Sequence, residues 1–88
     1  MALYEFNNLD LEDKFNYVWN SPESGFKCYC VEGGYKYVLF DCGKFFAESC
    51  VRDGKTISIE GFELTDDRLN AYIDWMEEHK DDPKYQMF

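Results

Sequence analysis

The chain has 88 residues, with 18 acidic side chains against 9 basic ones and a formal net charge of −9. A chain of this length predicts one small domain over residues 1–88. Because 19% of the residues are aromatic, the domain can bury enough apolar area to form a core without a metal ion or disulfides. The acidic excess disfavours direct binding to DNA, RNA or an anionic membrane, since like charges repel, and it favours a basic partner.

A first helix is predicted after Asn7. Asn8 or Asp10 can accept hydrogen bonds from the free backbone amides at its start, and Pro22 ends it, because a proline pushes the preceding residue out of helical dihedral angles. Apolar side chains recur at the spacing of one helix face, which predicts that this face packs on the core. They are Leu11, Phe15, Val18 and Trp19.

Four strands follow, joined by short turns. The turn at Gly33-Gly34 contains residues that tolerate positive φ, and Asp53-Gly54 between two strand-like runs favours a tight primed turn. In the first strand Cys28 and Cys30 alternate with larger residues, so both point to one face. Short turns between consecutive strands predict an antiparallel meander. The strands are predicted at residues 26–31, 35–40, 45–51 and 56–60.

The last predicted element is an acidic helix. Thr65 is the expected N-cap, with Asp66 and Asp67 in the first turn, where the helix dipole favours acids. The predicted order is α-β-β-β-β-α, and the fold class is α+β, a four-stranded antiparallel meander with two helices packed on one face. The apolar face of the last helix comprises Leu69, Tyr72, Ile73 and Met76.

The opposite face of this helix is the main candidate site. Carboxylates at positions i and i+4 lie about 5–6 Å apart, a separation similar to that of phosphates along one DNA strand, so such a row can mimic a nucleic-acid backbone. Trp75 lies beside the row and is a candidate aromatic anchor. The alternative is that these acids form an ordinary solvated face. The predicted partner-binding residues are Asp67, Asp74, Glu77, Glu78 and Asp81, and Asp10, Glu12 and Asp13 extend the row if the two helices lie side by side.

The sequence predicts no catalytic residue, cofactor or metal site. His79 is the only histidine, and no nucleophile is recognisably paired with it. Zinc sites usually combine close cysteine pairs with roughly two to four intervening residues, whereas one residue separates Cys28 from Cys30, and Cys42 and Cys50 stand apart. Free core thiols are therefore expected, with a cross-strand disulfide or a metal site as the alternatives.

One strand runs from Gly34-Tyr35-Lys36-Tyr37 to Phe40-Asp41, and after a short meander the acidic helix contains Tyr72-Ile73-Asp74-Trp75-Met76-Glu77-Glu78. This arrangement, over roughly residues 33–82, resembles small phage-encoded anti-CRISPR proteins of the acidic kind that inhibits the type I-F surveillance complex. The resemblance implies a DNA mimic that occupies the basic channel of an effector subunit, where target duplex is first engaged. It makes Asp74, Glu77 and Glu78 substitutes for phosphates. A different nucleic-acid-binding enzyme is an equally compatible target.

These patterns together predict a non-enzymatic inhibitor that blocks the nucleic-acid site of a bacterial defence complex, with a CRISPR-Cas effector subunit as the candidate partner. One alternative is an immunity or adaptor protein that binds by shape and by aromatic anchors, at Trp75 or at the face of Tyr35 and Tyr37. Another is a small cysteine-based metal or redox module. The chain start lacks the features of a signal peptide and no apolar run approaches ~20 residues, so a cytoplasmic protein is expected, as a monomer or a homodimer.

Overall fold

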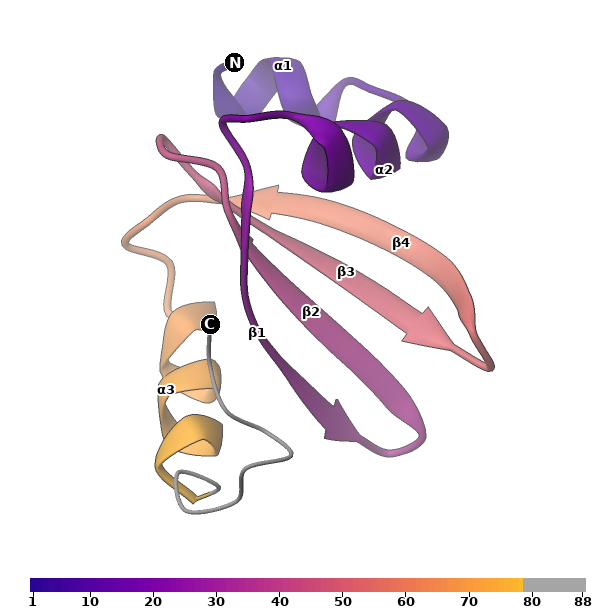
Figure 1. Ribbon diagram of the computed structural model, residues 1–88. Helices are drawn as coiled ribbons and strands as arrows, with labels where there is room; N and C mark the ends of the chain where they lie inside the picture. Colours follow the sequence, from indigo (N-terminus) through magenta and orange to yellow (C-terminus); the bar gives the residue numbers. More distant parts are fainter. Residues whose placement is uncertain (79–88) are drawn as a thin grey trace.

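The computed structural model describes residues 1–78, in which helices flank a four-stranded sheet (Figure 1). The α+β class and the predicted order of strands and flanking helices are confirmed. One short helix that was not predicted, α1, precedes the predicted first helix. The elements are α1 (Leu3–Asn7), α2 (Leu11–Asn20), β1 (Gly25–Glu32), β2 (Tyr35–Asp41), β3 (Phe46–Arg52), β4 (Lys55–Phe62) and α3 (Arg68–Glu78).

The sheet is an antiparallel meander in which each strand pairs with its neighbour in the chain, in the order β1-β2-β3-β4. Gly33 and Gly34 have φ values of 58° and 83°, and Asp53 and Gly54 have φ values of 53° and 76°. Positive φ at both central residues is what a type I′ turn requires. The tight turns predicted from Gly-Gly and Asp-Gly are therefore confirmed, and they fix the register of two hairpins.

The two N-terminal helices cover one face of the sheet. Asp10 is the N-cap of α2, because its Oδ1 accepts a hydrogen bond from the backbone amide of Asp13 at 2.8 Å. Asn7 fixes α1 to β4: its side-chain amide donates to the Gly61 carbonyl at 3.1 Å and accepts from the Gly61 amide at 2.8 Å. The core on this face includes Phe6, Val18, Val38, Phe40, Phe45, Ala47 and Ile59.

The C-terminal helix covers the opposite face, so the prediction that both helices pack on one face is wrong (Figure 1). Val38 and Phe40 of β2 belong to the core under α1 and α2, whereas Leu39, between them, belongs to the core under α3. Both faces of β2 are apolar, and each needs a helix to remove it from water. The second core consists of Cys28, Leu39, Phe62 and Tyr72, with Cys30, Tyr37, Phe46, Leu69 and Met76 packed against it.

Each predicted apolar helix face is buried only in part. On α2, Val18 is buried, but Leu11, Phe15 and Trp19 are 40%, 41% and 50% exposed. On α3, Ile73 is 52% exposed. The reason is geometric, because a helix lying on a sheet buries one narrow side and leaves the edges of its apolar stripe accessible.

The start of α3 also differs from the prediction. Asp66, and not Thr65, supplies the capping side chain, since its Oδ1 accepts a hydrogen bond from the Arg68 amide at 2.8 Å. The Arg68 guanidinium then pairs with Glu60 of β4 at 3.3 Å and lies 4.9 Å from the ring centroid of Phe62. These contacts fix the beginning of the helix against the last strand.

The hydrogen bond between Tyr72 and Glu48 is expected to stabilise the packing of α3. Tyr72 is buried, and its hydroxyl donates to Glu48 Oε2 at 2.6 Å. Tyr72→Phe keeps the ring but leaves a half-buried carboxylate without this donor, so we expect the free energy of unfolding to fall by about 1–3 kcal/mol. Urea unfolding followed by circular dichroism measures the change. Tyr4→Phe, at a tyrosine that is 71% exposed, is the matched control; equal stability of both variants would contradict this role.

Candidate functional site

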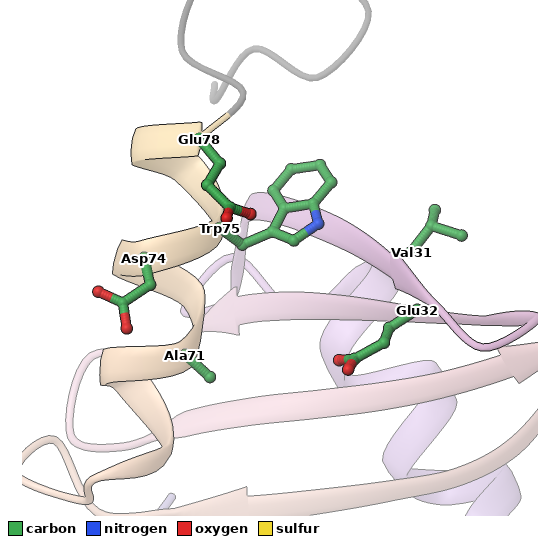
Figure 2. Close-up of a pocket in the computed structure, with 6 residues that line it drawn as sticks. All are labelled: Val31, Glu32, Ala71, Asp74, Trp75 and Glu78. Atoms are coloured by element: carbon green, nitrogen blue, oxygen red, sulfur yellow. The ribbon is translucent and has the colours of Figure 1, made fainter.

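A cleft of about 410 Å³ lies between α3 and the end of β1 (Figure 2). The indole of Trp75 projects from α3 into the space between helix and strand, and Val31 and Glu32 lie across from it on β1 (Figure 2). Trp75 is half-buried, so its ring forms a wall of the cleft while part of it remains accessible. The lining residues are Val31, Glu32, Ala71, Asp74, Trp75 and Glu78.

Carboxylates dominate the rim of this cleft. Glu32, Asp74 and Glu78 are acidic, and no lysine or arginine belongs to the described lining. Asp74 and Glu78 are one helical turn apart, so their Cβ atoms lie about 5–6 Å from one another. No ion pair among residues 1–78 involves these three acids. The cleft therefore has a negative potential that the described part of the chain does not neutralise.

A smaller hollow of about 130 Å³ adjoins the cleft, since both are lined by Glu32 and Ala71. It also contains Glu48, which already accepts the hydrogen bond from Tyr72. Burial, together with that hydrogen bond, raises the pKa of Tyr72 well above its ordinary value. The phenol thus stays protonated, and Glu48 has a structural role that the three acids of the cleft do not share.

An aromatic wall with an acidic rim suits a basic side chain. A guanidinium or ammonium group over an indole gains about 0.5–2 kcal/mol, depending on how far it is desolvated. Carboxylates at the rim offer charge-assisted hydrogen bonds to the same group. The geometry thus fits the cationic end of a lysine or arginine side chain.

The structure brings together three of the predicted binding residues, Asp74, Trp75 and Glu78. Glu32 completes the cleft and was not predicted. Strand alternation places Glu32 on the same face of β1 as Cys30, which packs against the core under α3. That alternation is visible in the sequence, but it locates Glu32 beside the acidic helix only once the side on which α3 packs is known.

The other predicted residues of the acidic helix do not line the cleft. Asp67 and Glu77 are exposed and lie outside the lining. Asp81 lies outside the described residues, as does His79.

The acids at the start of α2 do not extend the row, so this part of the prediction is wrong. Asp10, Glu12 and Asp13 belong to α2, which packs on the face of the sheet opposite α3 (Figure 1). The condition for one continuous row, two helices side by side, is not met. The acids of α2 and α3 form two separate surfaces with the sheet between them.

Three of the four cysteines belong to or pack against the two cores, and Cys50 is half-buried outside them. Cys28 and Cys30 pack in the core under α3, on one face of β1 as predicted. Both thiols are free, as are those of Cys42 and Cys50, and no group of three or more His, Cys, Asp or Glu residues within residues 1–78 is placed to hold a metal ion. Burial raises the pKa of the Cys28 and Cys30 thiols from 9.0 to about 11. They behave as small apolar side chains.

The thiols of Cys28 and Cys30 are expected to react slowly with iodoacetamide. Because the thiolate is the reactive form, a pKa raised from 9.0 to about 11 lowers the rate near pH 8 by about 100-fold. Mass spectrometry of alkylated peptides measures each site. Urea should restore the rates by at least this factor. Equal rates in the folded and the unfolded chain would contradict the described packing.

Comparison with known proteins finds no match to this chain among family models, curated proteins or solved structures. Within residues 1–78, no helix is long and apolar enough to cross a membrane. Function must therefore be inferred from the chemistry of the cleft.

Proposed function

We propose that the protein is a non-enzymatic inhibitor that binds the nucleic-acid site of a basic partner protein through α3 and the adjoining cleft. The observation that carries the proposal is the cleft itself, which combines three carboxylates and an indole, with no basic side chain among the lining residues within 1–78. Nucleic-acid-binding proteins hold phosphates with arginine and lysine, and these are the groups that the cleft accepts. The net charge of −9 would steer such a partner toward the molecule.

In this proposal Asp74 and Glu78 substitute for neighbouring phosphates, and Trp75 packs against the side chain that they hold. Asp67 and Glu77, both exposed, strengthen the negative field along the same helix. The resemblance to acidic anti-CRISPR proteins favours a DNA-binding subunit of a bacterial defence complex as the partner, in the cytoplasm of the host cell. The inhibitor itself makes no direct contact with nucleic acid.

A capture experiment tests this function. The full chain is immobilised, a lysate from bacteria that carry defence systems is passed over it, and the column is eluted with excess duplex DNA. The proposal predicts that DNA releases a nucleic-acid-binding protein, because the two compete for one site. A captured protein that stays bound in excess duplex would contradict mimicry of nucleic acid.

Charge reversal in the cleft is expected to abolish binding to the captured partner. Asp74→Lys combined with Glu78→Lys replaces two acids by cations, and the Kd measured by calorimetry should rise by at least ~100-fold. Both side chains are exposed, so the fold should persist. Asp13→Lys combined with Glu63→Lys changes the net charge equally at exposed positions outside the cleft lining. Equal losses in the two double variants would mean that net charge, and not this site, determines affinity.

The half-buried Trp75 in the cleft favours a second candidate function, an immunity or adaptor protein that binds through an aromatic anchor. The dependence of the binding affinity on salt concentration distinguishes the two candidate functions. Mimicry predicts that affinity falls at least ~10-fold when NaCl rises from about 0.05 to about 0.3 M, because salt screens the carboxylate contacts. Trp75→Ala should then weaken binding less than the Asp74 and Glu78 double reversal does. An affinity that is insensitive to salt but lost in Trp75→Ala would support the adaptor instead.

A further inference from the structure

An apolar surface on α2 has no role in the proposed function. Leu11, Phe15 and Trp19 run along one side of this helix, and all three are exposed. The rings of Phe15 and Trp19 lie 6.2 Å apart, and the Trp19 ring meets that of Phe40 edge-on at 4.9 Å. The stripe is therefore packed on the sheet at Trp19, although a large part of each side chain remains in water.

The same face of the sheet has further partly accessible apolar side chains. Tyr29 of β1 and Val51 of β3 pack at the margin of the core that α1 and α2 cover, and both are half-buried. Lys36 of β2 is opposite Val51 in the ladder and is exposed, with its Nζ 4.4 Å from the ring centroid of Tyr29. The stripe on α2 and this part of the sheet lie on the same face of the sheet. We define the α2 shelf as Leu11, Phe15, Trp19, Tyr29 and Val51.

The α2 shelf has a helix part and a sheet part, and the charged residues beside these two parts are of opposite sign. Glu12 is exposed and lies three residues before Phe15, on the same side of α2. Lys36 lies on the sheet part. The same division holds for the longer segments, because residues 1–25 carry five acids and one base, whereas residues 26–57 carry four acids and five bases. The helix part of one molecule is thus complementary in charge to the sheet part of another.

We propose that the α2 shelf is the interface of a symmetric dimer formed with a second copy of this chain. A two-fold axis through the shelf would place the α2 stripe of each copy on the open sheet part of the other, with Glu12 of each copy near Lys36 of its partner. An isologous interface requires a surface that complements itself after a two-fold rotation, and an apolar shelf with an acid on one part and a base on the other meets this requirement. The cleft beside α3 lies on the opposite face, so this proposal does not rest on the proposed function.

Sedimentation equilibrium of the full chain tests the dimer. We expect a reversible species of twice the 10.5 kDa chain mass, with a Kd of about 100 µM or tighter. Phe15→Glu, at 41% exposure, should raise this Kd at least ~10-fold. Leu64→Glu introduces the same charge at another large apolar residue, which is 43% exposed but outside the shelf, and it should leave the Kd unchanged. A chain that remains monomeric up to about 0.5 mM would overturn the proposal.

Two charge variants test the symmetry of the pairing. Glu12→Lys and Lys36→Glu each bring like charges together in both symmetric contacts, so each variant alone should be monomeric. An equal mixture of the two variants should form a heterodimer, because each contact again joins an acid to a base. Circular dichroism checks that both variants are folded. If the single variants dimerise like the wild type, or if the mixture stays monomeric, this arrangement is wrong.

Discussion

Both faces of the sheet are apolar, and the rest of the structure depends on covering them. The consecutive residues Val38, Leu39 and Phe40 of β2 are all buried, although successive side chains of a strand point to opposite sides. Two tight turns and one short loop join the four strands, so the helices that cover the sheet come from the two ends of the chain. The N-terminal helices take one face and α3 takes the other (Figure 1). Loss of the cover on either face would expose one of the two cores to water, and each buried apolar square ångström contributes roughly 25 cal/mol.

Because helices cover both faces of the sheet, the acidic side chains are divided between two separate surfaces. This arrangement separates the acids of α2 from those of α3, and it brings α3 beside β1, where Glu32 joins Asp74 and Glu78 around Trp75. Two sheet acids on the side of α3 already have partners on that helix, because Glu60 pairs with Arg68 and Glu48 accepts a hydrogen bond from Tyr72. The contacts that hold the helix thus use one set of carboxylates and leave another set to line the cleft. The α2 shelf lies on the other face of the sheet, apart from this cleft.

Local chemistry was sufficient to predict the strands and their turns. Asp53-Gly54 and Gly33-Gly34 each specify a turn whose conformation few other residue pairs adopt, and the structure has positive φ at all four positions. The five-residue helix α1 could not be predicted, because so short a helix is stable only through tertiary contacts such as those of Asn7 with Gly61.

The sequence contains one indication that the helices lie on opposite faces of the sheet. Val38, Leu39 and Phe40 are three consecutive apolar residues, a pattern typical of a strand that is buried on both sides. The candidate site could be predicted only in part for the same reason. The helical residues Asp74, Trp75 and Glu78 follow from periodicity along one element, whereas Glu32 belongs to the cleft because of how two elements pack.

Carboxyl footprinting of the complex with its captured partner would test most directly whether α3 and its cleft are the binding surface. Free and bound protein are labelled with a carbodiimide and an amine, and the modified residues are quantified by mass spectrometry. Binding through the cleft predicts that Glu32, Asp74 and Glu78 become protected while Glu12 and Asp13 of α2 are labelled as in the free protein. Unchanged labelling of the three acids in the cleft, or protection confined to α2, would contradict the assignment of the binding surface to α3.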